Sequence, residues 1–390
     1  MKLSIPTNWQ QDLIPRLEKE NIDELYGKLA CDFVGGGRAS FLIPHVSRKQ
    51  AALHVKEAHQ NGLKFSYLLN TTCLGNLEWT ASGQKKIRQL FDWLVSIKVD
   101  QVTVAIPYLL ELAKKCYPQL KVAISTQAGI DTVERARFWN DLGADKLTLS
   151  VVDVNRNFGL LKRIRKNVKC ELQLIANLLC LYRCPFYKYH SVLNAHASQS
   201  GYRLKGFVID YCSLKCTSYR LSHPVEFIRS LWIRPEDTHY YEDVGIDSIK
   251  LVDRGMNSEA ISLITNAYSK RRYDGNLLDL MPHATKNIMF QDSGLLHKLR
   301  YFLRPFLVNI FKLQKGRGLF SGTRIYIDNN KLDGFINHFL SNDCSLRSCQ
   351  ECTYCQNVSN EVLKIYPDDQ LKRMDKYISE LVSGDMFKYF

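Results

Sequence analysis

The chain has 390 residues, 45% of them hydrophobic, which suits one large domain with appendages better than several small domains. It begins MKLSIPTNWQ, without the apolar core of a secretory signal, and no apolar run is long enough to span a bilayer, so we expect a cytoplasmic protein with no transmembrane segment. The formal net charge of +14 favours an anionic partner such as RNA or an acidic ligand. A solvated basic face explains the charge equally well.

Short apolar runs alternate with helical stretches from about residue 25 onward. The runs are nearly continuous in apolar residues, which is typical of parallel strands covered by helices. Eight β/α units over about 250 residues have the number and size of an α/β fold of the (β/α)8, TIM-like barrel type. A doubly wound open sheet is the alternative, but it does not account for eight units in a row. The predicted strands are residues 30–36, 64–70, 101–107, 121–127, 146–152, 171–177, 227–233 and 248–254.

Most predicted strands end in a polar residue. In a (β/α)8 barrel the active site lies at the carboxyl ends of the strands, so this row of residues is where we expect the site. The residues at these ends are Asn70, Pro107, Gln127, Asp153, Cys180, Arg234, Asp253 and Arg254.

The connection between the sixth and seventh predicted strands, residues 178–226, is far longer than an ordinary loop. It carries four cysteines and several aromatic residues, so we expect an ordered and functional insertion. The predicted organisation is a catalytic barrel domain over residues 1–285, which includes this insertion. A basic and aromatic extension with a terminal cysteine cluster, an accessory module, follows over residues 286–390.

Eight of the twelve cysteines are clustered, which in a reducing compartment indicates metal or redox chemistry rather than disulfides. Two C-x-x-x-C pairs, Cys180 with Cys184 and Cys212 with Cys216, lie within the insertion. Four thiolates can hold an iron–sulfur cluster or a tetrahedral zinc ion. Their place at a barrel rim, without the C-x-x-C spacing of zinc knuckles, favours a cluster. Zinc and unligated thiols are the alternatives.

The last cysteine group reads CSLRSCQECTYC and comprises Cys344, Cys349, Cys352 and Cys355. Its spacing is similar to a ferredoxin ligand run and also to a small zinc-binding tail. We expect an accessory metal site here, either a second [4Fe–4S] cluster or zinc. The basic and aromatic stretch at 295–320 suits nucleic acid, a partner protein or a membrane face, and equally a helix packed on the barrel.

Several segments resemble the U-32 peptidase family, also called collagenase-like proteases. The chain departs from the better-known signature, in which a Gly-Ser or Gly-Ala pair precedes the first cysteine, because that stretch reads ANLLC here. The resemblance is therefore to a divergent branch. The matching segments are STQAG (125–129), ELQLIANLLCLYRCPFYKYH (171–190), DYCSLKCT (210–217), IRPEDTHYYEDVGIDSIKLVDRG (233–255) and the late cysteine group.

The resemblance implies a cofactor and a reaction. Several members resemble oxygen-independent hydroxylases that carry a [4Fe–4S] cluster on four cysteines in a barrel. They act on ubiquinone precursors or RNA bases with prephenate as oxygen donor, and some work in pairs, which implies a partner protein. By this resemblance Cys180, Cys184, Cys212 and Cys216 would be the cluster ligands.

We therefore expect an iron–sulfur oxidoreductase of the hydroxylase type that acts on an anionic substrate. The substrate would be an RNA base, a carboxylate, an aromatic or isoprenoid small molecule, or a peptide. Arg234 and Arg254 could hold a carboxylate or phosphate, Gln127 could orient it, and His190 could transfer protons. Each residue also has a plain structural interpretation: ion pairs with nearby acids for the arginines, and packing or solvation for the histidine.

Two other functions stay open. Hydrolysis is suggested by the older name of the family, but the chain has neither an HExxH helix nor a GxSxG elbow. A cluster-stabilised barrel that only binds RNA or a peptide would need no catalytic groups at all.

Overall fold

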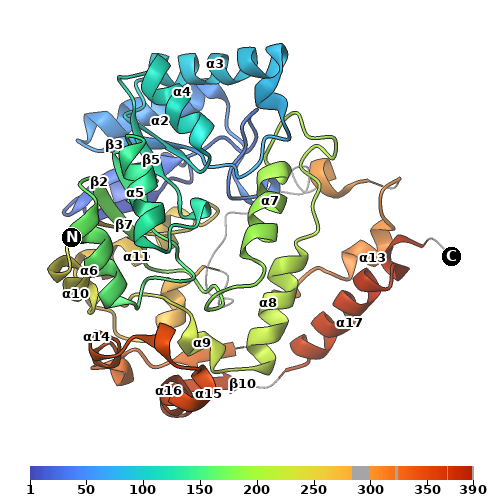
Figure 1. Cartoon of the computed structure of the whole chain (residues 1–390). Helices are drawn as coiled ribbons and strands as arrows, with labels where there is room; N and C mark the ends of the chain where they lie inside the picture. Colours follow the sequence, from blue (N-terminus) through green and yellow to red (C-terminus); the bar gives the residue numbers. More distant parts are fainter. Residues whose placement is uncertain (283–298, 305, 321–323, 367, 389–390) are drawn as a thin grey trace.

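The computed structural model describes residues 1–282, 299–304, 306–320, 324–366 and 368–388. Eight parallel strands close into a barrel in chain order, with β1 paired to both β2 and β8 (Figure 1). The predicted (β/α)8 fold is confirmed. The strands are β1 (Lys2–Pro6), β2 (Ile22–Gly27), β3 (Lys64–Leu69), β4 (Gln101–Val104), β5 (Lys121–Ile124), β6 (Lys146–Thr148), β7 (Glu171–Ile175) and β8 (Ser248–Lys250).

Six of the predicted strands coincide with β3 to β8, and the other two predictions are wrong. Residues 30–36 form a loop, and residues 227–233 begin as helix α9 (Glu226–Arg229) and continue without regular structure. In their place, β1 and β2 open the barrel near the N-terminus. The insertion at 178–226 therefore follows the seventh strand of the barrel, β7, and not the sixth.

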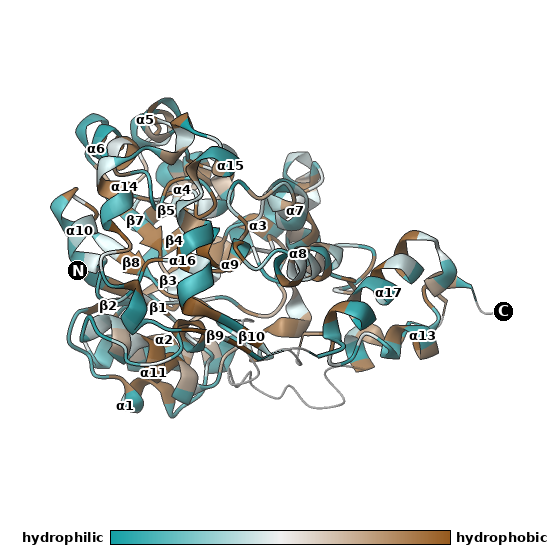
Figure 2. Cartoon of the chain, turned by 90° about the horizontal axis from the view of Figure 1, so that it is seen from below, coloured by the Kyte–Doolittle hydropathy of each residue, from teal (hydrophilic) through white to brown (hydrophobic). Residues whose placement is uncertain are grey.

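Helices surround the barrel, and five of them, α2, α3, α5, α6 and α11, start at a side-chain cap. Ser47 and Gln50 form a capping box at the start of α2, and Thr80 and Asn157 cap α3 and α6. Figure 2 shows hydrophobic residues gathered in the strands, with hydrophilic residues on the outer faces of the helices. These helices are α1 (Leu13–Arg16), α2 (Arg48–Gln60), α3 (Ala81–Ser96), α4 (Pro107–Cys116), α5 (Val133–Asp141), α6 (Phe158–Asn167), α10 (Thr238–Asp243) and α11 (Ser258–Ser269).

The inside of the barrel is polar near the amino ends of the strands. Glu24 on β2 accepts hydrogen bonds from Ser4 on β1 at 2.7 Å and from Gln101 on β4 at 3.2 Å. It also pairs with Lys146 on β6, with 3.2 Å between Oε2 and Nζ. Every one of these side chains is buried. The barrel is therefore crossed by a buried charge pair with hydrogen-bonding neighbours, and not filled only by aliphatic side chains.

The insertion supplies α7 (Tyr187–Ala197) and α8 (Tyr211–Ser222), which lie to one side of the ring of helices (Figure 1). Near the end of the chain, α17 (Gln370–Val382) packs on α8. Leu214 of α8 and Met374 of α17 belong to one small core that is separate from the core of the barrel. The end of the chain is thus attached to the insertion.

The segment before α17 packs on the barrel itself. Ile327, Phe335 and Val362 belong to the same hydrophobic core as the strands. No helix among the described residues is both long enough and apolar enough to cross a membrane. The elements of this part are α13 (Ile310–Gln314), β9 (Arg324–Ile327), α14 (Asn337–Ser341), α15 (Cys349–Cys352), α16 (Tyr354–Val362) and β10 (Leu363–Tyr366).

The basic and aromatic stretch at 295–320 is described only in part, since residues 295–298 and 305 lie outside the described residues. Within it, Phe306 and Phe311 are exposed, whereas Tyr301 is buried. Residues 286–294 of the predicted extension also lie outside the described part of the chain.

A histidine on the buried face of α2 is expected to lower the stability of the fold at acid pH. His54 Nε2 lies 2.7 Å from the Thr7 hydroxyl, and burial lowers the pKa of His54 to about 4. The unfolded chain takes up this proton at about pH 6.5, so folding is favoured above that pH and the contribution is lost as the pH falls towards 4. We expect this loss of the His54 contribution to lower the free energy of unfolding by about 3 kcal/mol.

Urea denaturation at pH 7.5 and pH 4.5 measures this contribution. The wild-type protein should lose about 3 kcal/mol more unfolding free energy between the two pH values than His54→Gln does. Equal losses in the two proteins would show that other groups are responsible.

Candidate functional site

A loop that follows β2 lies over the carboxyl end of the barrel. A β-carbon on Gly36 would come within 2.7 Å of the side-chain oxygen of Asn70, and one on Gly37 within 3.1 Å of the amide nitrogen of Gln127. The backbone N–H of Gly37 donates to Asn70 Oδ1 at 3.1 Å. The stretch 30–36 therefore leads into a close-fitting cover over the ends of β3 and β5.

One buried cation at this mouth is fully neutralised. Lys28 directly follows β2 and pairs with Asp32 of the covering loop. Tyr67 on β3 donates its hydroxyl proton to the same carboxylate at 2.8 Å. This group therefore holds the loop in place and leaves little charge for a ligand.

A second buried cation, Lys250, is the last residue of β8. Its Nζ atom lies 3.7 Å from the centroid of the Tyr26 ring. Burial lowers the pKa of Lys250 to about 7, against the opposing charge of Glu24. An amine with this pKa can take up or release a proton near neutral pH. The sequence analysis missed Lys250. Its two-residue spacing from Ser248, another buried polar residue, is the signal that would place it inside the barrel.

Arg254 lies four residues beyond Lys250 and is 6% exposed. Its Nη1 atom is buried and has no hydrogen-bond partner in the described part of the chain. The carboxylate of the preceding residue, Asp253, pairs with Arg38 of the covering loop. Buried guanidinium groups are ordinarily satisfied, so an unpartnered nitrogen marks a place where an anionic group can bind.

The first cysteine pair lies at the same end of the barrel. Cys180 and Cys184 pack in a small apolar cluster with Ile175, at the end of β7, and Val252, after β8. The positive charge of Arg38 also reaches the Cys180 thiol. The pair is therefore adjacent to the cations of the mouth.

The second pair is carried on successive turns of α8. Asp210 caps this helix by accepting a backbone N–H of its first turn at 2.9 Å. Arg220, one turn after Cys216, donates to the Leu179 carbonyl at 2.6 Å and to Cys216 Sγ at 3.7 Å. A buried guanidinium thus joins α8 to the segment that carries the first pair. Neither Arg220 nor its role was predicted from the sequence.

The four thiols affect one another's ionisation. Burial, with a contribution from the neighbouring Cys184 and Cys216, raises the pKa of Cys180 to about 12. Burial likewise raises the pKa of Cys212 to about 12, with contributions from the same two neighbours. Cys180 and Cys212 are therefore hard to ionise in this state, and their ionisation requires added positive charge such as that of a metal centre.

This donor set fits an iron–sulfur cluster in number and chemistry. Within the described residues, no three His, Cys, Asp or Glu side chains are arranged to hold a single metal ion. A [4Fe–4S] cluster instead takes one thiolate at each of four corners, so its ligands need not meet at one point. Four neighbouring thiols with a buried arginine beside them meet that requirement.

Two predicted catalytic residues border the cysteine group. The Ser191 hydroxyl of α7 donates to Gln127 Oε1, which joins the insertion to the end of β5. His190 Nε2 lies 3.0 Å from Asp210 Oδ2, at the start of α8. Gln127 therefore holds the insertion at the mouth, whereas His190 joins α7 to the start of α8 within the insertion, and the catalytic roles of both stay predictions.

Arg234 does not act as predicted. It is 1% exposed and donates to Asn329 Oδ1 at 3.0 Å, to the Leu332 carbonyl at 2.5 Å and to Asp333 Oδ1 at 2.7 Å. Its guanidinium is thus occupied by the C-terminal segment. An ion pair with a nearby acid is also present, to Glu236 at 3.3 Å. Arg234 anchors this segment and is not available to hold a substrate.

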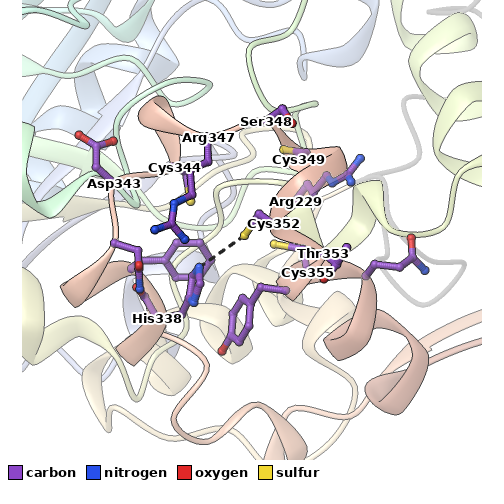
Figure 3. A pocket seen from close by; sticks show the side chains of 14 residues that line it. Arg229, His338, Asp343, Cys344, Arg347, Ser348, Cys349, Cys352, Thr353 and Cys355 are labelled. Carbon is purple, nitrogen blue, oxygen red and sulfur yellow. Dashed lines mark hydrogen bonds between the residues drawn. The ribbon is translucent and has the colours of Figure 1, made fainter.

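The C-terminal cysteines line a pocket of their own. Figure 3 shows Cys344, Cys349, Cys352 and Cys355 around this pocket, with His338 at its edge. The Cys352 sulfur lies 3.7 Å from His338 Nε2. All twelve cysteines of the chain are free of disulfides. The structure therefore brings each predicted set of four cysteines together at a separate place.

Comparison with known proteins identifies the family. The profile of Peptidase family U32 matches residues 39–191. An uncharacterized protease of Methanocaldococcus jannaschii is 30% identical over 350 residues, which is 90% of this chain and 91% of that protein.

Two solved structures are also similar in part. One is that of a U32 peptidase, with a TM-score of 0.48 and 24% identity over 65% of this chain and 93% of that chain. The other is a chain of the tryptophan synthase complex from Pyrococcus furiosus, with a TM-score of 0.33 and 11% identity over 52% of this chain and 90% of that chain. The sequence relationships alone decide the assignment: this chain belongs to Peptidase family U32.

Proposed function

We propose that this chain is an iron–sulfur oxidoreductase that modifies an anionic substrate at the barrel mouth, in the manner of an oxygen-independent hydroxylase. The observation that carries the proposal is the buried, unpartnered Nη1 atom of Arg254, which lies in the field of Arg38, the same arginine whose charge acts on the Cys180 thiol. Cys180, Cys184, Cys212 and Cys216 would hold a [4Fe–4S] cluster, which supplies electron transfer when bound.

The residues of the mouth divide the remaining tasks. Arg254 binds a carboxylate or phosphate through its free nitrogen. Lys250, with its pKa near 7, exchanges a proton with the bound substrate. The loop that contains Gly36 and Gly37 packs closely against Asn70 and Gln127 at the strand ends and would limit the access of water to the mouth.

Hydrolysis is the alternative that the family name suggests, and one hydroxyl–imidazole pair could be taken for a nucleophile and its base. Thr7 and His54 are hydrogen bonded at 2.7 Å, with Glu57 4.0 Å from the other ring nitrogen. Thr7 has no exposed surface, however, and it also accepts the backbone N–H of Trp9 at 3.0 Å. This pair belongs to the packing of α2 and is closed to a peptide.

Anaerobic purification followed by iron and sulfide analysis tests the proposal. We expect a brown protein, bleached by dithionite, that loses about four irons per chain in Cys180→Ser and in Cys216→Ser. Cys116→Ser is the matched control, because Cys116 is an exposed, solitary cysteine, and it should keep all its iron. A wild-type protein that contains no iron after reconstitution would contradict the proposal.

A further inference from the structure

We infer that the C-terminal pocket is a second thiolate-bound metal centre, held by Cys344, Cys349, Cys352 and Cys355, that fastens the end of the chain to the barrel. Zinc and a [4Fe–4S] cluster share this ligand chemistry. The inference does not depend on the function proposed for the barrel mouth, because the two sites have no cysteine in common.

The local fold places all four cysteines around one pocket, although, as at the mouth, no three of them are arranged to hold a single metal ion. Ser348 and Glu351 form a capping box that starts α15 between Cys344 and Cys352. Thr353 then takes a left-handed conformation, with φ of 50°, and turns the chain from α15 into α16. Two short helices with a sharp turn between them thus return three cysteines to one pocket, opposite the fourth (Figure 3).

The surroundings of the pocket are cationic and incompletely satisfied. Arg229 and Arg347 line it. Arg156 is 4% exposed, and its Nε atom, like that of Arg229, is buried without a hydrogen-bond partner in the described residues. Arginines left in this condition indicate a missing anionic occupant. Four thiolates bound to zinc or to an iron–sulfur cluster carry net negative charge and would supply it.

Arg156 also connects the pocket electrostatically to the barrel. Its guanidinium lies over the rings of Trp232 and Phe335, at 4.3 and 4.8 Å from their centroids. It donates to the Ile228 carbonyl at 2.7 Å. Its charge also acts on the thiol of Cys355. A negative centre in the pocket would therefore be attached, through this arginine, to the segment that follows α9.

Two hydrogen bonds fix the C-terminal segment near the two ends of the stretch that carries the cysteines. Asn157, the cap of α6, donates to Asp343 Oδ1 at 3.1 Å. The Tyr354 hydroxyl donates to the Phe335 carbonyl at 3.0 Å. Cross-linking of residues 344 to 355 by one metal centre would hold these contacts together, which assigns the centre a structural role.

His338 allows a competing interpretation. Its ring stacks on Tyr354 with 3.9 Å between centroids, and its Nε2 lies 3.7 Å from Cys352 Sγ. A Cys–His pair at this distance could act as a nucleophile and base in a hydrolase. In a metal centre, the same imidazole would instead donate a hydrogen bond to a ligand sulfur. The two interpretations differ in how many cysteines are protected from alkylation: a metal centre protects all four, whereas a nucleophilic pair leaves Cys352 reactive.

Elemental analysis of the full-length protein, purified without oxygen, is the first test. We compare the wild type with the doubles Cys349→Ser/Cys355→Ser and Cys180→Ser/Cys216→Ser. Each double variant should lose the metal of the site at which its cysteines are replaced and keep the metal of the other site. Loss of zinc in the first double identifies a zinc site, and loss of about four irons identifies a cluster. An unchanged metal content in this double would overturn the inference, whatever happens at the mouth.

Alkylation with iodoacetamide covers the case in which the double variant does not fold, because it uses the wild-type protein. We expect the four cysteines of residues 344–355 to react only after the metal is removed with EDTA and ferricyanide. All four should then become reactive together. Rapid reaction of Cys352 alone in the untreated protein, abolished by His338→Ala, would overturn the metal centre in favour of a nucleophilic pair.

Discussion

Replacement of Arg234 by methionine is expected to lower the free energy of unfolding by about 3–5 kcal/mol and to loosen the C-terminal segment from the barrel. The guanidinium is buried and donates to Asn329, Leu332 and Asp333. Methionine keeps much of the side-chain volume, so the loss reflects these hydrogen bonds and not a cavity. The Leu332 carbonyl and the Asn329 side-chain oxygen would be left buried without this donor.

Urea denaturation of Arg234→Met and limited proteolysis around residues 329–333 measure the two effects. Arg135→Met is the matched control, since Arg135 also forms an ion pair, with Asp131 at 2.7 Å, but on the surface. Exposed pairs contribute about 0–1 kcal/mol, so the control should remain near the wild type. A loss below about 1 kcal/mol in Arg234→Met would mean that the C-terminal segment is held by other contacts.

Periodicity was sufficient for the six strands from β3 to β8 because each is a short apolar run followed by a helix or by the insertion, and four of the helices start at a side-chain cap. It failed at β2 because IDELYG carries one of its two acidic residues, Glu24, into the barrel, where it meets Lys146. The polar inner face makes a buried strand look like a surface segment.

The two false strands fail for the opposite reason. ACDFVGG and FIRSLWI are apolar runs that are buried without being strands. Val34 is buried in the covering loop, and Trp232 is buried beside Arg156. An apolar run shows that a segment is buried, but it does not show which hydrogen bonds the backbone makes.

Of the candidate site, the sequence predicted the cysteines, which are recognisable from their spacing, but not the groups around them. Each set of four cysteines is recognisable in the sequence, and the structure brings the members of each set together. The groups that surround them come from distant parts of the sequence: Arg38 lies 142 residues before Cys180, and Arg156 lies about 200 residues before Cys355. Nothing local to Arg220 shows that the fold will bury it, and for Lys250 the only local signal is its two-residue spacing from Ser248 on β8.

Replacement of Glu24 by methionine should remove about 3–5 kcal/mol of unfolding free energy, because it leaves the Lys146 ammonium buried opposite an apolar side chain. Glu24 is 3% exposed and Lys146 4% exposed. The remaining acidic neighbour of Lys146, Glu171, is 3.5 Å away and its side chain is 40% exposed. That carboxylate is too well solvated to replace the partner inside the barrel.

The double variant Glu24→Met/Lys146→Met is the matched control for this interpretation. Removal of both charges should restore most of the stability lost in the single variant, since two apolar side chains of similar volume need no partner. Chemical denaturation of the two single variants and the double gives the coupling energy directly. If the double is less stable than Glu24→Met, Lys146 stabilises the fold through another contact, such as its ion pair with Glu171 at 3.5 Å, and not by its pairing with Glu24.

The same variants connect the interior of the barrel to the proposed chemistry at its mouth. Glu24 raises the pKa of Lys250, whereas Lys146 lowers it. Glu24→Met should therefore move the pKa of Lys250 further below about 7, and Lys146→Met should move it upward. NMR titration of the Lys250 side chain in each variant measures both shifts. Opposite shifts would show that a buried pair near the amino ends of the strands sets the protonation of the amine at their carboxyl ends, and equal shifts would show that burial alone sets it.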